Sequence, residues 1–159
     1  MARRLDDFER IARQAYRFTE AASPQREAGH PFDSRNLHSD LPPDTRRLFD
    51  NGHFAQSTFE AFKFVDEEMQ RISNDNDFGT SLMMRVLGGV SPAIKLTPMM
   101  TETEKKEQEG FKFLFAGGVL AIRNPRAHKS GMSDDPDTCL DHLTFASMLL
   151  RKLDEAGLR

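Results

Sequence analysis

Apolar side chains recur at spacings of three and four residues along most of this chain, which is the period of an amphipathic helix. The longest such pattern runs from Phe54 to Ile72, with charged residues elsewhere around the helix. Its apolar stripe consists of Phe54, Thr58, Phe62, Val65, Met69 and Ile72. No segment alternates apolar and polar residues with a period of two, so we expect no sheet. The pattern predicts an all-α fold, a helical bundle of about four to six helices.

The N-terminal part of the chain contains one further stripe. This stripe occupies residues 3–22 and predicts a helix that ends at Ser23-Pro24. The stretch that follows, to Leu41, is rich in Pro, Gly, Asp, Ser and His and predicts a long loop. We therefore divide the chain into residues 1–41, an N-terminal helix plus a long loop, and residues 42–159, the helical bundle domain. A length of 159 residues suits one globular unit overall.

Proline and glycine residues mark the ends of the other helices. Two prolines suit the first turn of a short helix over residues 42–51. A further helix is predicted over residues 79–87, where a pair of glycines ends it, and residues 90–100 are predicted to form a loop broken by prolines. The last helix is expected over residues 136–157, between a proline and a glycine.

The remaining helix begins at a capping box, in which Thr101 is followed three residues later by Glu104. It runs to Arg123, and its apolar face consists of Phe111, Leu114, Phe115, Gly118 and Ile122. Because a proline disfavours helical geometry in the residue before it, Pro125 is expected to force Asn124 away from helical geometry. The helix should therefore stop or kink at this point.

The charge balance limits the kinds of partner that the protein can have. The chain has 22 Lys and Arg against 25 Asp and Glu, a formal net charge of −3. A general nucleic-acid binder that neutralises many phosphates is normally basic. Any contact with nucleic acid should therefore be local and made by a small basic patch.

Three features bear on where the protein resides. Cys139 is the only cysteine, which excludes an internal disulfide and is consistent with a reducing compartment. The longest apolar run, Phe113–Ile122, is shorter than the roughly 17–25 residues that a bilayer requires. The N-terminal arginines are not followed by an apolar stretch, so we expect no signal peptide. These features predict a cytoplasmic protein without membrane contact.

The run from Arg123 to His128 carries the candidate chemistry. Arg123 ends an apolar helix, where the helix dipole favours a positive charge. In a continuous helix the side chains of Arg123 and His128 would point about 140° apart. A break at Pro125 would allow the chain to turn and bring His128 back toward Arg123.

These residue types suit cleavage of RNA without a metal. Histidine, with an unperturbed pKa near ~6.5, can remove or donate a proton at neutral pH. Arginine stays charged and can donate hydrogen bonds to phosphate oxygens as negative charge builds on them. On this interpretation His128 is the general acid or base, Arg123 stabilises the scissile phosphate and Asn124 orients either group. Arg126 and Lys129 form the local basic patch that binds the substrate, and a symmetric dimer would supply a second histidine.

Other interpretations of the same residues stay open at this point. An arginine followed by a histidine is a weak motif, and Arg123 could simply cap helix carbonyls while His128 is an ordinary loop residue. His53, at the start of the longest helix, could line the same cleft or serve in packing or capping. The remaining histidines have no ligand-like spacing with each other or with Cys139, so we predict neither a metal nor a cofactor. These histidines are His30, His38 and His142.

Several segments taken together resemble the Ymh-type family of bacterial proteins within the HEPN superfamily of helical nucleases. The resemblance covers roughly residues 42–156 and depends on their joint pattern. The segments are Leu48–Phe54, Phe59–Lys63, Gly79–Met83, Glu109–Phe111 and Ile122–His128. The superfamily is defined by an arginine, four to six further residues and a histidine, with a polar residue just after the arginine. Arg123, Asn124 and His128 match that form.

The resemblance implies a helical bundle that dimerises around the arginine–histidine motif. Active HEPN proteins are metal-independent endoribonucleases of toxin–antitoxin, abortive-infection and CRISPR-linked defence systems, which implies an RNA substrate and a cognate inhibitor or defence-system partner. The resemblance likewise implies His128 as acid or base, Arg123 as phosphate stabiliser and Asn124 as an assisting group. Some HEPN toxins are neutralised by adenylylation of a tyrosine two residues after the histidine, but Ser130 occupies that position. Other HEPN proteins are non-catalytic modules that bind a protein partner or a nucleotide ligand, and this is the alternative function.

Overall fold

The structure is a computed structural model that describes residues 29–128 and 131–159. The chain divides into two compact units, residues 1–30 and residues 31–159. The helix expected over residues 3–22 lies outside the described residues. Every regular element in the described part of the chain is a helix, which confirms the prediction of an all-α bundle.

The five helices predicted after residue 41 are present, with boundaries close to the predicted ones. The regular elements of the described residues are α2 (Pro31–Ser34), α3 (Pro43–Asp50), α4 (Phe54–Ser73), α5 (Gly79–Val86), α6 (Glu102–Gly117), η1 (Gly118–Arg123), α7 (Asn124–His128) and α8 (Pro136–Glu155). The predicted capping box is present at α6, where Thr101 Oγ1 accepts from the Glu104 amide at 3.2 Å and Glu104 Oε2 accepts from the Thr101 amide at 2.9 Å. Both bonds satisfy amide groups that have no partner within the helix.

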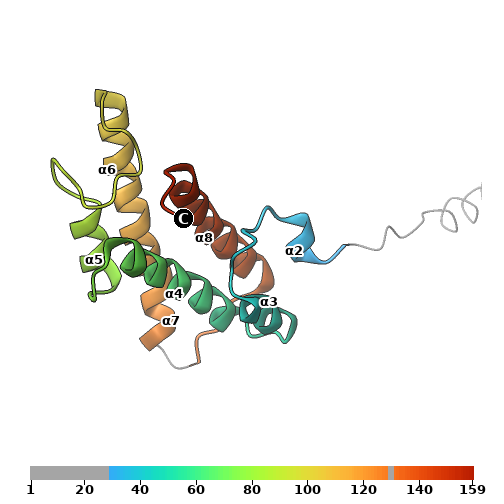
Figure 1. The fold of residues 1–159 in the computed structure, drawn as a ribbon. Coiled ribbons are helices and arrows are strands. Elements are labelled where there is room, and N and C mark those ends of the chain that lie inside the picture. Colours follow the sequence, from blue (N-terminus) through green and yellow to red (C-terminus); the bar gives the residue numbers. More distant parts are fainter. Residues whose placement is uncertain (1–28, 129–130) are drawn as a thin grey trace, which may run out of the picture. The chain divides into compact units, whose positions relative to one another are not determined.

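Helix α4 lies at the centre of the bundle and contacts α3, α5, α7, α8 and η1 (Figure 1). Its predicted apolar stripe forms one side of the core. The stripe residues Phe62, Val65 and Met69 are fully buried, and they belong to the same cluster as Leu143 and Leu150 of α8. Removal of this apolar surface from water is the main source of stability, and it fixes α4 and α8 relative to each other.

The segment between residues 31 and 41 differs from the long loop that the composition predicted. It contains α2, and Phe32 and Leu37 pack against the core while Leu41 is buried within it. The backbone amide of His38 also donates to Ser147 Oγ of α8 at 2.9 Å. The apolar residues of this segment are widely spaced among polar ones and show no helical period. Their packing could therefore not be predicted from the sequence, because it depends on the surface formed by the other helices.

Residues 90–100 contain no helix, as predicted, but they are tightly held. The buried side chain of Gln108 accepts from the amide of Leu96 at 2.7 Å and donates to the carbonyls of Leu87 and Ile94 at 3.0 and 2.9 Å. Ile94 and Leu96 are themselves part of the core. One glutamine of α6 therefore connects this loop to the bundle.

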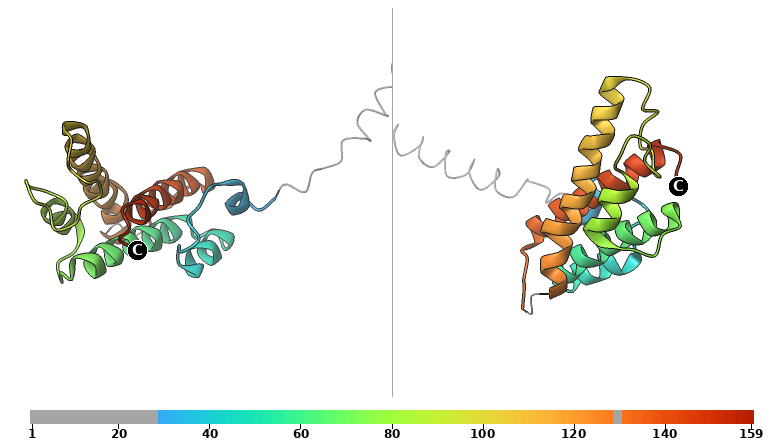
Figure 2. Two further views of the ribbon diagram at one scale, coloured as in Figure 1. Left: turned by 45° about the horizontal axis from the view of Figure 1, so that its top comes forward. Right: turned by 90° about the vertical axis from the view of Figure 1, so that its left-hand side faces the viewer.

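The predicted break at Pro125 is absent, because α6, η1 and α7 follow one another as a single helical run (Figures 1 and 2). Asn124 is helical, with φ −62° and ψ −42°, so the expectation of a stop or kink was wrong. The element η1 is a π-helix, and the amide of Asn124 donates to the carbonyl of Val119, five residues back. The wider π-helical turn gives the ring of Pro125 room.

The π-helical turn begins where the backbone lies close to α4. A Cβ atom on Gly118 would lie 2.7 Å from Cε1 of Phe62 and 3.4 Å from Cε1 of Phe145. The absence of a side chain at Gly118 therefore allows η1 to pack directly on the core. This contact sets the position of Arg123, the last residue of η1.

Candidate active site

Arg123 lies at the end of η1, with its guanidinium next to two side chains of α4. Its Nη2 atom is 4.0 Å from Oδ2 of Asp66, and its Cζ atom is 5.5 Å from the centre of the Phe59 ring. Its Nη1 atom donates to Oδ1 of Asn124 at 3.1 Å. The structure thus brings Arg123 and Asn124 together, as predicted, and adds Asp66 and Phe59.

Local geometry explains why Phe59 and Asp66 share this site. They are seven residues apart on α4, and that spacing places two side chains on the same face of a helix. Asp66 also reaches α5, where both of its carboxylate oxygens accept from the amide of Gly79 at 2.9 and 3.1 Å. Gly79 has φ +73°, a left-handed conformation that favours glycine. Asp66 is therefore the point at which α4, α5 and η1 meet.

Two opposing effects act on the Asp66 carboxyl. Burial raises its pKa above the ordinary value, while the Gly79 amide and the Arg123 charge lower it and Asp77 raises it further. The net pKa is raised. Burial is the largest cause because the side chain is removed from the water that would stabilise its charge.

The Arg123 guanidinium has hydrogen-bonding capacity left over. Its Nε atom is buried and has no hydrogen-bond partner among the described residues. The contact with Asp66 at 4.0 Å is an ion pair without a hydrogen bond, and the Arg123 side chain is 18% exposed. A buried donor without a partner costs free energy. An anionic oxygen entering this site could satisfy it by a charge-assisted hydrogen bond.

Arg126 lies in a different environment from the one predicted. Its Nε and Nη2 atoms donate to the two carboxylate oxygens of Asp134, both at 2.7 Å, and its Nη1 donates to the carbonyl of Ile122 at 2.7 Å. The side chains of Arg126 and Asp134 are only 5% and 6% exposed. The expected basic patch therefore lacks this guanidinium at the surface, because the carboxylate of Asp134 neutralises it in the interior.

His142 of α8 joins the Arg126 pair, with its Nδ1 atom 3.3 Å from Nη2 of Arg126. Burial and the adjacent positive charge of Arg126 lower the pKa of His142. The ring is therefore favoured in its neutral form, which can accept from Arg126 at Nδ1. Cys139, also on α8, is buried, and burial raises the pKa of its thiol. A thiol of raised pKa is a poor nucleophile at neutral pH.

The other predicted site residues lie at the end of α7 or just beyond it. His128 is the last residue of α7 and belongs to the same helical run as Arg123, so the turn at Pro125 that was expected to bring His128 back toward Arg123 is absent. Lys129 and Ser130 lie outside the described residues. His53 is exposed at the residue before α4 and makes no side-chain cap there. It lines a pocket of about 260 Å³ together with Asp134 and residues 131–133.

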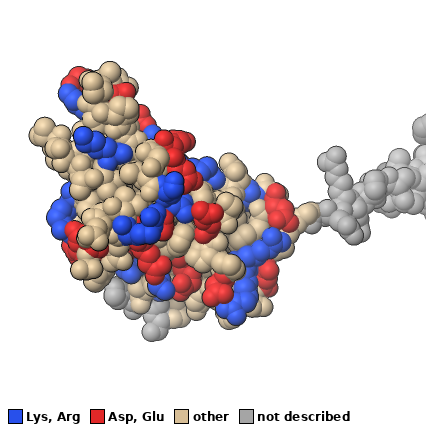
Figure 3. Space-filling model, viewed as in Figure 1, with Lys and Arg blue, Asp and Glu red and all other residues tan. Residues whose placement is uncertain are grey.

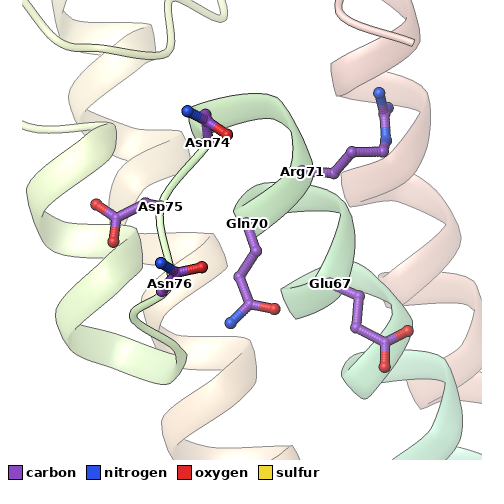
Figure 4. A pocket seen from close by; sticks show the side chains of 6 residues that line it. All are labelled: Glu67, Gln70, Arg71, Asn74, Asp75 and Asn76. Carbon is purple, nitrogen blue, oxygen red and sulfur yellow. The ribbon is translucent and has the colours of Figure 1, made fainter.

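A larger polar pocket, of about 450 Å³, lies at the C-terminal end of α4 (Figure 4). Its lining consists of Glu67, Gln70, Arg71, Asn74, Asp75 and Asn76. Figure 4 shows the side chains of Arg71 and Asp75 pointing away from each other. Arg71 is already bound to both oxygens of Glu68, at 3.1 and 2.9 Å. The pocket therefore presents no converging charged groups.

Charge is mixed over the face of the molecule shown in Figure 3, where Lys and Arg side chains alternate with Asp and Glu. Within the described residues, no group of three or more His, Cys, Asp or Glu side chains is arranged to hold a metal ion. None of the helices in that part of the chain is both long and apolar enough to cross a membrane.

Sequence reasoning missed Asp66, Asp134 and His142 as neighbours of the two arginines. Asp66 carried a weak signal, because it lies between segments that contributed to the family resemblance, one with Phe59 and one with Gly79. Asp134 carried none, since an acidic residue in a polar loop ordinarily faces solvent. Its burial depends on the position of Arg126, which only the packed helices determine.

These features define a class, an all-helical bundle in which two arginines of one helical run are largely buried. Arg126 is bonded at all three guanidinium nitrogens, whereas Nε of Arg123 has no partner among the described residues. The chain belongs to the Hypoth_Ymh family, described as a protein of unknown function, whose family model matches residues 35–153. The matched region contains both arginines and their carboxylate partners. No curated protein and no solved structure is found to match the chain.

Proposed function

We propose that this protein is a metal-independent endoribonuclease of the HEPN superfamily, acting in a bacterial or phage defence system or a toxin–antitoxin system. The observation that carries the proposal is the incompletely bonded guanidinium of Arg123, with its unpartnered Nε and its long contact to Asp66. A phosphodiester is an anion with two non-bridging oxygens, and a guanidinium can donate hydrogen bonds to both of them. Arg123 has the free donor that such binding requires.

The proposed reaction needs only side-chain chemistry. His128 removes the proton of the ribose 2′-OH, whose oxygen attacks the adjacent phosphorus and breaks the bond from phosphorus to the 5′-oxygen. The leaving 5′-oxygen takes up a proton, from His128 or from the second histidine of a dimer. Arg123 stabilises the negative charge that builds on the phosphate oxygens. Asn124 holds Arg123 through the bond between Nη1 and Oδ1.

A homodimer that uses the face around Arg123 and His128 is part of this proposal. Its support is a row of exposed apolar side chains on the helix that leads to Arg123, with Phe113 at 55%, Leu114 at 42% and Leu120 at 59% exposure. Gly117 lies in the same row, and a Cβ atom there would meet nothing within 4 Å. Exposed apolar rows of this kind commonly mark protein–protein contacts. A cognate inhibitor or defence-system partner would restrain the nuclease.

The competing function is a non-catalytic helical module that binds a protein partner or a nucleotide-like ligand. It is favoured by the ion pair between Arg123 and Asp66, since a mostly buried pair can serve the fold alone. This alternative predicts folded protein that binds at the same place and cleaves nothing.

The test is cleavage of labelled RNA in the presence of EDTA by the wild type, His128→Ala and Arg123→Ala. A loss of about two to four orders of magnitude in either variant is expected from removal of an acid–base group or a phosphate stabiliser. Arg47→Ala is the matched control, because Arg47 is an exposed arginine of α3 that pairs with Asp44 in the same helix. Equal cleavage by wild type, His128→Ala and Arg123→Ala would overturn the assignment.

A further inference from the structure

We propose that Arg126, Asp134 and His142 form an internal anchor that holds the end of α7 against the start of α8 and so positions His128. In this role Arg126 is a positioning residue and does not contact the substrate. The inference rests on the proposed function, because it assigns His128 a task that requires precise placement. It replaces the substrate-binding role that the sequence predicted for Arg126.

Each guanidinium nitrogen of Arg126 has a hydrogen-bond partner, whereas Nε of Arg123 has none among the described residues. These partners of Arg126 lie at 2.7 Å and are the two oxygens of Asp134 and the carbonyl of Ile122. The fork of two parallel bonds to one carboxylate fixes the orientation of both groups. A phosphate could reach this guanidinium only by breaking the fork, because Arg126 and Asp134 are 5% and 6% exposed.

The three residues connect two helices on either side of the segment 127–133. Arg126 lies in α7, two residues before His128, and His142 lies in α8. Asp134 directly precedes Asp135, whose carboxylate caps α8 by accepting from the amide of Thr138 at 3.0 Å. The anchor therefore fastens both ends of the segment to the bundle.

The anchor limits the positions that the backbone at the end of α7, two residues beyond Arg126, can occupy. The contact from Arg126 to the Ile122 carbonyl also ties α7 to η1, the element that carries Arg123. A displacement of about 1 Å in a catalytic group can reduce the rate about 100-fold, so an anchor two residues from His128 affects the chemical step directly.

The experiment compares steady-state RNA cleavage by the wild type, Arg126→Lys and Asp134→Asn. Arg126→Lys keeps the charge and removes the fork, whereas Asp134→Asn keeps the shape and removes the charge. For both variants we expect kcat to fall about 10- to 100-fold, with KM and the salt dependence of KM unchanged. The control is Glu68→Gln, which weakens another mostly buried pair, 2.8 Å to Arg159. It should lower the melting temperature and leave kcat unaltered.

Different outcomes separate this inference from a direct role for Arg126 in binding. A higher KM together with a weaker salt dependence in Arg126→Lys would show that Arg126 binds phosphate and would overturn the inference. An unchanged kcat in Asp134→Asn, or an equal loss in Glu68→Gln, would overturn it as well.

A second readout keeps the inference testable if the wild type cleaves no RNA and the proposed function fails. The imidazole resonances of His128 are identified by NMR from their absence in His128→Ala. Loss of the anchor in Asp134→Asn should shift or broaden them, while Glu68→Gln leaves them in place. His128 resonances that are identical in wild type and Asp134→Asn would overturn the anchor role.

Discussion

Arg123 Nη2 lies 4.0 Å from Oδ2 of Asp66, too far for a hydrogen bond, while both groups are largely withdrawn from water. The pair that Arg126 forms three residues further along differs, since Arg126 donates to both oxygens of Asp134 at 2.7 Å. Of two arginines in one helical run, one therefore forms a hydrogen-bonded ion pair and the other an ion pair without a hydrogen bond. The loose pair leaves a donor for an incoming anion, and the tight pair holds the fold.

Removal of the Asp66 charge should strengthen anion binding at Arg123. Asp66→Asn retains an oxygen that can accept from the Gly79 amide, so the α4–α5 contact is kept. A partly screened ion pair is worth about 1 kcal/mol or less, so we expect the Kd for an uncleavable 2′-O-methyl RNA to fall about two- to five-fold. Fluorescence anisotropy measures this change. Weaker binding by Asp66→Asn than by wild type would contradict it.

Asp66 should also make the free energy of unfolding depend on pH. Its folded pKa is raised above 3.8, so the folded protein still holds a proton at a pH where the unfolded chain has lost it. The contribution of Asp66 to stability therefore increases as pH falls through the raised folded pKa and levels off below 3.8. The free energy of unfolding is measured with urea for the wild type and Asp66→Asn at several pH values. As the pH is lowered, the value for the wild type should increase relative to that of the variant. A constant difference would rule this out.

His142 should act in the opposite direction. Its folded pKa is lowered from 6.5, so the unfolded chain takes up a proton before the folded protein does. Stability contributed by neutral His142 is present above 6.5 and is lost as pH falls below that value. His142→Gln removes the titrating group and keeps an acceptor near Arg126. Just below pH 6.5, we expect the free energy of unfolding of this variant to change less with pH than that of the wild type, as measured by urea denaturation. The same pH dependence in both proteins would contradict this prediction.

Gly118 and Gly117 form a matched pair for testing the contact between η1 and α4. A Cβ atom at Gly118 would lie 2.7 Å from the fully buried Phe62 ring, whereas one at Gly117 would meet nothing within 4 Å. Gly118→Ala should lower the free energy of unfolding by about 1–3 kcal/mol through overpacking. Gly117→Ala should raise it by about 0.5–1 kcal/mol, because alanine favours a helix over glycine. Urea denaturation measures both, and equal effects would contradict the proposed packing.

The prediction at Pro125 shows the limit of local rules. The preference of a residue before proline for extended geometry is real, but it is smaller than the packing energy of a helix on a core. In this bundle the π-helical turn relieves the clash, and Asn124 stays helical. The turn begins at Gly118, which lies close to Phe62, a residue far away in the sequence. The residues next to Pro125 in the sequence do not reveal this contact.

The sequence by itself determined the helices and their ends. The stripe of α4, the capping box of α6 and the proline that begins α8 each depend on residues within a few positions of one another, which is the range of helical hydrogen bonds and helix caps. It also identified Arg123 and Asn124 as neighbours in a candidate site.

Only the tertiary structure decided which carboxylate lies next to which arginine. Asp66, Gly79 and Arg123 come from three elements, and their meeting depends on how the core packs those elements together. The same packing buries Arg126 with Asp134 and leaves Arg123 with a free donor. Both residues are arginines of one short run, so the local sequence does not predict which of them is bonded to a carboxylate. Burial and the placement of carboxylates separate them, because the free energy of a charge depends on its surroundings.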